Sequence, residues 1–141
     1  MFVLGIDPGL SRCGYGVVEQ VGNKPEAVAI GVIRTPPKAA TAHRLAAVHR
    51  EFQELIEEYR PEVVAIERVF FQVNARTAMG VAQVSGLAMA VGAAAGAEVV
   101  EYTPNQVKEA VAGWGNATKE QMQRMVQSLL SLPDLPTPQD A

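Results

Sequence analysis

Two acidic residues stand at the ends of apolar segments that are far apart in the chain. Residues 1–7 read Met-Phe-Val-Leu-Gly-Ile-Asp, and residues 63–67 read Val-Val-Ala-Ile-Glu. Each segment is typical of a buried β-strand. A carboxylate at the end of such a strand is costly to desolvate unless it binds a cation or another partner. If the two strands are neighbours, about 4.8 Å apart, Asp7 and Glu67 lie within reach of one or two divalent ions.

Carboxylates without histidine or cysteine neighbours favour Mg²⁺ or Mn²⁺, which prefer oxygen ligands and bind substrate phosphate. The two histidines, His43 and His49, fall on a predicted amphipathic helix, where a solvated surface position is the better interpretation. Two metal ions can activate water and stabilise the leaving oxygen of a phosphodiester. A structural alternative stays open, in which Asp7 caps a turn and Glu67 forms a salt bridge.

Length and charge limit the possible classes of protein. The chain has 141 residues, 48% of them hydrophobic and 19% charged, which predicts a single folded domain over residues 1–141. The net charge of −3 gives no overall attraction to nucleic acid, so such a ligand needs a local basic patch. The basic residues available in the second half include Arg68, Arg76, Lys108, Lys119 and Arg124.

The cellular setting is predicted from two features. Cys13 is the one cysteine, so no internal disulfide can form, which agrees with the reducing cytoplasm. No basic region precedes the first apolar segment, as a secretory signal would require. The stretch between Arg76 and Glu98 carries no charge and is long enough to span a bilayer. Its alanine and glycine content, with Gln83 and Ser85 in the middle, favours a packed helix instead.

The first half of the chain predicts three strands and one helix. The first strand ends at Asp7, the second covers residues 14–21 and the third covers residues 27–33. The short turns between them indicate an antiparallel meander. A helix is predicted over residues 41–59, where apolar residues recur at three- and four-residue steps. These residues are Leu45, Val48, Phe52, Leu55, Ile56 and Tyr59.

The second half alternates strands and helices. A strand over residues 63–67 follows the first helix, which implies a crossover and parallel pairing. A helix over about residues 75–95 and a strand over residues 98–102 come next. Two Thr-x-x-Gln capping boxes, at Thr103 and Thr118, begin two shorter helices, and a proline-rich tail ends the chain. This order predicts an α/β fold with a five-stranded mixed sheet, three strands antiparallel and two parallel.

Four motifs, in order along the whole chain, resemble the RuvC family of Holliday-junction resolvases. They are Gly5-Ile6-Asp7-Pro8-Gly9, Ala65-Ile66-Glu67-Arg68-Val69-Phe70, Gln106-Val107-Lys108 and Asp140-Ala141. The resemblance implies an RNase H-like fold, which agrees with the predicted element order. It also implies a homodimeric, Mg²⁺-dependent endonuclease that nicks two strands of a four-way DNA junction symmetrically. The implied products are a 5′-phosphate and a 3′-hydroxyl.

The resemblance also assigns residues. Asp7, Glu67 and Asp140 match three of the family's catalytic, metal-binding acids, and the fourth would lie beyond Ala141 together with the family's last helix. A site with three acids is expected to bind metal more weakly. Phe70 matches the aromatic that stacks in the opened junction. Phe71 is equally compatible with stacking on a base and with packing in the core.

Two lysines and the partners follow from the same resemblance. Lys108 and Lys119 match lysines near the scissile phosphate. Asn74 and Arg76 are expected to contact the DNA backbone because they open the long helix, and not because of the resemblance. The long helix would contribute to a two-fold dimer contact, and the RuvA–RuvB branch-migration complex is the implied partner.

Three rival functions can be weighed at this point, and two of them stay open. A two-domain ATPase of the actin or sugar-kinase type needs more chain than 141 residues supply. A catalytically crippled junction-binding module and a relative acting on another nucleic acid both remain compatible with the sequence.

Overall fold

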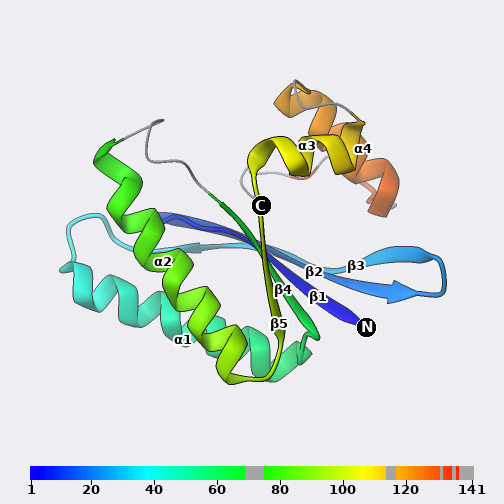
Figure 1. Cartoon of the computed structure of the whole chain (residues 1–141). Coiled ribbons are helices and arrows are strands. Elements are labelled where there is room, and N and C mark those ends of the chain that lie inside the picture. The colour runs from blue at the N-terminus through cyan, green and yellow to red at the C-terminus, as the bar shows by residue number, and fades with distance from the viewer. Residues whose placement is uncertain (69–74, 114–116, 131, 135, 137–141) are drawn as a thin grey trace.

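The computed structural model describes residues 1–68, 75–113, 117–130, 132–134 and 136. It contains one five-stranded sheet with helices on both faces (Figure 1). The elements in chain order are β1 (Phe2–Asp7), β2 (Arg12–Val21), β3 (Lys24–Arg34), α1 (Thr41–Tyr59), β4 (Val63–Glu67), α2 (Ala75–Ala94), β5 (Glu98–Tyr102), α3 (Pro104–Ala112) and α4 (Lys119–Leu130). Within the sheet the strand order is β3-β2-β1-β4-β5.

The pairing of the strands confirms the predicted mixed sheet. β1 pairs with β2 and β2 with β3 in antiparallel fashion, whereas β4 runs parallel to both β1 and β5. The long connection through α1 permits the parallel pairing of β4 with β1, because a parallel neighbour cannot be reached by a tight turn. The carboxyl ends of β1, β4 and β5 therefore lie at the same edge of the sheet.

The main core lies between the sheet and the pair α1 and α2, which Figure 1 shows together on one face. The predicted stripe of α1 supplies Val48, Phe52, Leu55 and Ile56, all of them buried. From the sheet, alternate residues of β1 and β4 point into the same layer and are buried; these are Leu4, Ile6, Val64 and Ile66. This alternation leaves the intervening residues on the opposite face.

α3 and α4 form a thinner layer on that opposite face (Figure 1). α4 has no buried residue. Both capping boxes are present: Thr103 exchanges hydrogen bonds with Gln106, and Thr118 does the same with Gln121. Local capping therefore begins both helices, and α3 also follows directly from β5. Deep burial contributes little to the stability of this layer.

The β2–β3 hairpin differs from the prediction. The turn is confined to Gly22 and Asn23, and β3 already begins at Lys24 and includes Pro25. Proline lacks a backbone donor, but β3 is an edge strand, where one row of donors needs no partner in the sheet. Gly22 has a φ of 61°, which a glycine adopts without strain.

α2 packs against the sheet, although its length and composition would also suit a membrane span. Gly92 lies against the sheet, because an added Cβ would meet Val64 at 3.1 Å and Val99 at 3.2 Å. Gly80 faces inward in the same way, toward Leu10. These two glycines therefore pack against other parts of the same chain. Gly86 is different, because a Cβ added there would meet nothing within 4 Å, so it is available to an outer surface of α2.

Candidate functional site

The parallel register places Asp7 and Glu67 next to each other. The pairs between β1 and β4 run from Val3–Val63 to Ile6–Ile66, and Asp7 and Glu67 follow as the last residues of their strands. Ile6 and Ile66 point into the α1/α2 core, so the two acids share the other face. Adjacent strands lie about 4.8 Å apart. Two half-buried carboxylates from distant parts of the chain thus meet at one edge and on one face.

On the β1/β2 side of the acids the sheet surface is rich in glycine, with an alanine on β4, a feature that sequence reasoning missed. Asp7 pairs with Gly14 across the sheet, and Gly5 pairs with both Gly16 and Ala65. A Cβ added at Gly5 would meet only a backbone oxygen of Gly16, at 3.8 Å. These residues, which we call the glycine floor (Gly5, Gly14, Gly16 and Ala65), place no bulky side chain on the sheet beside the acids. The repeated Gly-x-Asp and Gly-x-Gly spacings are the signal that could have revealed it.

Glu67 is next to the start of α3. It pairs with Tyr102 of β5, and the backbone N–H of Arg68 donates to the carbonyl of Tyr102 at 2.6 Å. α3 begins at Pro104, directly after its cap Thr103. The carboxyl end of β4 is therefore held beside a helix N-terminus, where backbone N–H groups favour anions.

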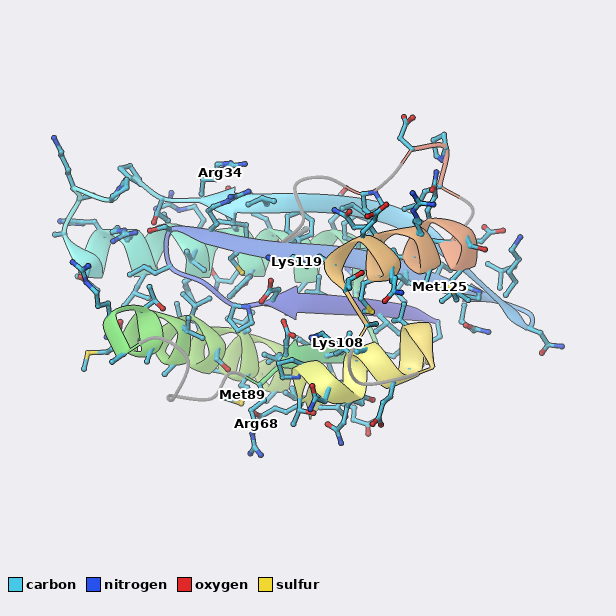
Figure 2. The ribbon with its side chains drawn as sticks, turned by 90° about the horizontal axis from the view of Figure 1, so that it is seen from above. Arg34, Arg68, Met89, Lys108, Lys119 and Met125 are labelled. Atoms are coloured by element: carbon cyan, nitrogen blue, oxygen red, sulfur yellow. The ribbon has the colours of Figure 1, made fainter. Side chains whose placement is uncertain are left out.

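Two lysines project from the layer above the acids. Lys108 lies in the second turn of α3 and is half-buried, and Lys119 is the first residue of α4 and is exposed. Figure 2, viewed from the α3/α4 side, shows both lysines on this side of the sheet. The α3/α4 face is also the face of Asp7 and Glu67, so the two lysines and the two acids share one side of the molecule.

Two of the predicted basic residues have acidic partners. Arg68 lies 3.3 Å from Glu101, and Arg124 lies 2.7 Å from Glu120, four residues earlier on α4. Both pairs are solvent-exposed, so each contributes little to stability. Arg76 is exposed on the first turn of α2. The local basic patch that the sequence suggested is therefore partly neutralised at Arg68 and Arg124.

Several predicted site residues lie outside the described part of the chain: Phe70, Phe71, Asn74 and Asp140. Their assigned roles stay predictions. Within the described ranges, no group of three His, Cys, Asp or Glu residues could hold a metal ion. Asp7 and Glu67 are the two predicted ligands within those ranges, and the predicted third ligand, Asp140, falls outside them.

Cys13 lies close to the site but is chemically protected. Burial raises the pKa of its thiol from 9.0 to about 12; a backbone hydrogen bond with Gly9 lowers that pKa, and the charge of Asp7 raises it. At pH 8 a pKa of about 12 leaves about one thiol in ten thousand ionised. The thiolate is the reactive form, so burial and the raised pKa both disfavour reaction of Cys13 in the folded protein.

We expect native Cys13 to resist a thiol-specific disulfide reagent at pH 8 and to react fully once urea unfolds the chain. The raised pKa contributes stability that is complete below pH 9.0, the unfolded value, and is lost as the pH rises toward about 12. The stability advantage of the wild type over Cys13→Ala should therefore narrow above pH 9, measured by urea unfolding. Reaction of the native thiol at the unfolded rate would contradict this assignment.

Comparison with solved structures shows which known proteins share this fold. "T. thermophilus RuvC in complex with Holliday junction substrate" superposes with a TM-score of 0.92 at 36% identity, covering 99% of this chain and 86% of that chain. The yeast mitochondrial Holliday junction resolvase Ydc2 matches with a TM-score of 0.67 at 16% identity, which shows a shared fold alone. The RNase H-like architecture expected from the sequence is thereby confirmed.

Sequence comparison agrees over the whole length. The family model for "Crossover junction endodeoxyribonuclease RuvC" matches residues 3–141. A relative of that name from Clavibacter michiganensis subsp. michiganensis is 51% identical, covering 100% of this chain and 70% of the relative. Another, from Pelotomaculum thermopropionicum, is 47% identical, covering 99% of this chain and 85% of the relative. The chain therefore belongs to the RuvC family of crossover junction endodeoxyribonucleases.

Proposed function

We propose that this chain resolves four-way DNA junctions by hydrolysing two phosphodiester bonds symmetrically, with Asp7, Glu67 and Asp140 as ligands of a divalent metal. The observation that supports this most strongly is the register that brings Asp7 and Glu67 to adjacent strand ends on one face. The activity matches the family to which the chain belongs. The products are a 5′-phosphate and a 3′-hydroxyl.

The residues present suit Mg²⁺, with Mn²⁺ as a substitute. The donors are carboxylate oxygens, which both ions prefer, and the described ranges place no sulfur or imidazole ligand with them. The glycine floor places no bulky side chain beside the acids to compete with the water molecules that Mg²⁺ retains. When bound, the metal supplies Lewis acidity and lowers the pKa of a coordinated water.

The chain's own residues position the substrate. Lys108 and Lys119 bind the phosphates that flank the scissile bond, and the first turn of α3 adds backbone donors. Arg76 and Asn74 contact the DNA backbone at the start of α2. Phe70 stacks on a base in the opened junction, a contact worth about 1–3 kcal/mol.

A second copy of the chain completes the assembly. α2 exposes Ala90 and Ala94 beside a groove of about 700 Å³ that α1 lines with charged residues including Arg50 and Glu54. The groove lies on the α1/α2 side, so a two-fold dimer formed there leaves both acid pairs accessible. Each protomer then nicks one of two opposed strands. The RuvA–RuvB complex supplies junctions by branch migration, and the cytoplasm is the setting.

A nicking assay tests the proposal directly. The purified chain is incubated with a labelled four-way junction, a linear duplex or an RNA–DNA hybrid, with Mg²⁺ or with EDTA. We expect paired nicks in the junction with Mg²⁺ and none with EDTA. Junction binding without nicking at any metal concentration would instead indicate a binding module without catalytic activity. Preferred cleavage of the hybrid would indicate a different nucleic-acid substrate.

The role of the lysines has its own test. Lys108→Ala should weaken junction binding and reduce the slope of log affinity against log salt by about 1, because one phosphate contact is lost. Lys119→Ala should act similarly. Affinity is measured in EDTA by fluorescence anisotropy across a salt series.

Lys24→Ala is the matched control for the lysine variants. Lys24 is exposed at the hairpin, where Val21 pairs with Lys24, at the opposite end of the strands from Asp7. Its removal changes the net charge equally but removes no proposed phosphate contact. If all three variants shift affinity to the same extent, net charge alone explains the effect and the assignment of Lys108 and Lys119 is wrong.

A further inference from the structure

We propose that Arg44 of α1 is a positioning residue for the reaction, because it fixes the turn that follows Asp7 and so fixes the carboxylate at the end of β1. The proposal rests on the metal role assigned above to Asp7. It assigns a role to a hydrogen-bonded cluster that includes none of the residues proposed for catalysis or DNA binding. We call this cluster the Arg44 clamp; it comprises Arg44, Thr35, Ser11 and the backbone of Leu10.

Arg44 joins α1 to both ends of the cluster. Its Nε–H donates to Thr35 Oγ1 at 2.9 Å, and one terminal nitrogen donates to Ser11 Oγ at 2.7 Å. Two donors of one planar guanidinium therefore hold two different segments in a fixed relation. Lysine has the same charge but lacks this rigid fork.

Thr35 passes the restraint to the turn. Its hydroxyl donates to the carbonyl of Leu10 at 2.6 Å, and its backbone N–H donates to the carbonyl of Ser11 at 3.2 Å. Thr35 is the one buried polar residue of the described core. A hydrogen bond in such an environment is costly to break, because the partner left behind cannot reach water.

The turn is too short and tight to absorb a displacement. Only Pro8 and Gly9 separate Asp7 from Leu10, and Pro8 is buried with its φ fixed by the ring. A Cβ added at Gly9 would clash with the carbonyl oxygen of Arg12, so the backbone folds closely on itself there. A shift at Leu10 or Ser11 therefore moves Asp7.

The other side of the turn is also held. The side chain of Leu10 lies against α2 at Gly80, where an added Cβ would be 3.1 Å from Leu10 Cβ. The turn is thus fixed between the Arg44 clamp and α2. Loss of the clamp would leave it supported from one side only. The carboxylate of Asp7 would then sample other positions relative to the neighbouring strand end at Glu67.

The arrangement distinguishes positioning from a simple effect of charge. If Arg44 acted by its positive charge, Arg44→Lys would behave like the wild type. If it acts through its fork, Arg44→Lys should weaken metal binding about tenfold, the lower range for losing a group that orients a ligand. Thr35 gives a second, uncharged test: Thr35→Val removes the hydroxyl at similar size, and Thr35→Ser keeps it.

The experiment is a calorimetric titration of the apo protein with Mn²⁺ alone, without DNA. We expect about tenfold weaker binding for Arg44→Lys and Thr35→Val, and wild-type affinity for Thr35→Ser. Circular dichroism checks that each variant is folded, and junction binding in EDTA should stay unchanged. In nicking assays the Mg²⁺ concentration at half-maximal rate should rise for Thr35→Val, while saturating Mg²⁺ restores the maximal rate.

Each outcome supports or contradicts the proposal. Wild-type Mn²⁺ affinity in folded Arg44→Lys would overturn it, as would equal affinity in Thr35→Val and Thr35→Ser. If Arg44→Lys does not fold, the Thr35 pair decides alone. Asp7→Asn serves as the reference: if it too binds Mn²⁺ like the wild type, the proposed metal site itself is wrong, and that failure is distinct from failure of the clamp.

Discussion

Replacing Asp7 with asparagine should abolish junction nicking while the protein still binds the junction. The amide keeps the size of the side chain but loses the negative charge that attracts a divalent cation. Changes to groups that merely orient a metal ligand cost about 10–100-fold, so loss of a ligand should cost more than about 100-fold in nicking rate. The rate is measured under single-turnover conditions with saturating Mg²⁺, and binding is measured separately in EDTA.

Two further variants make the Asp7→Asn result specific. Glu67→Gln should give a loss of similar size, because Glu67 holds the adjacent strand end. Glu51→Gln removes an equal charge from an exposed position of α1 that does not line the proposed dimer groove, and it should nick at the wild-type rate. A nicking rate within about threefold of wild type for Asp7→Asn would remove this pair of acids from the mechanism, since far larger losses accompany removal of a metal ligand.

Replacing Phe52 with alanine should destabilise the fold by about 3–5 kcal/mol, the usual cost of deleting a fully buried aromatic ring. Among the described residues, Phe52 is the largest fully buried side chain, and it lies on α1 within the main core. The free energy of unfolding of a domain is typically only about 5–15 kcal/mol, so this change would remove a large part of it. Urea unfolding followed by circular dichroism gives the free energy of unfolding.

The neighbouring position supplies the control for Phe52→Ala. Glu51 is exposed on the same helix, and Glu51→Ala should change the free energy of unfolding by less than about 0.5 kcal/mol. If both variants lose the same stability, burial of the Phe52 ring does not determine the cost, because alanine has a higher helix propensity than either residue it replaces. If Phe52→Ala is nearly neutral, α1 does not cover the sheet as described.

Patterns within short segments predicted much of the fold. The stripe of α1 is a repeat along one helix, and the structure gives that helix as Thr41–Tyr59, with Val48 and Phe52 buried as expected. Both capping boxes lie within four consecutive residues, and both form. Such signals depend on neighbours along the chain, so a sequence reveals them directly.

Other features depend on partners that are distant in sequence. The glycine floor arises only because β2 and β4 flank β1, which brings Gly14, Gly16 and Ala65 around Gly5. Arg44 bonds to Ser11, a residue 33 positions away, and to Thr35. No local periodicity marks these residues. The early start of β3 at Lys24 was missed for a similar reason, because Pro25 is tolerated in a strand only when that strand lies at a sheet edge.

The sequence by itself determined which residues could do chemistry and to which family they belong, because acid-terminated strands and ordered motifs are visible as local patterns. Tertiary structure alone decided that Asp7 and Glu67 share one face, since a shift of one residue in the β1–β4 register would turn one of them into the core. It also decided what holds them there, because hydrogen bonds such as those of Arg44 form only after distant segments have folded together.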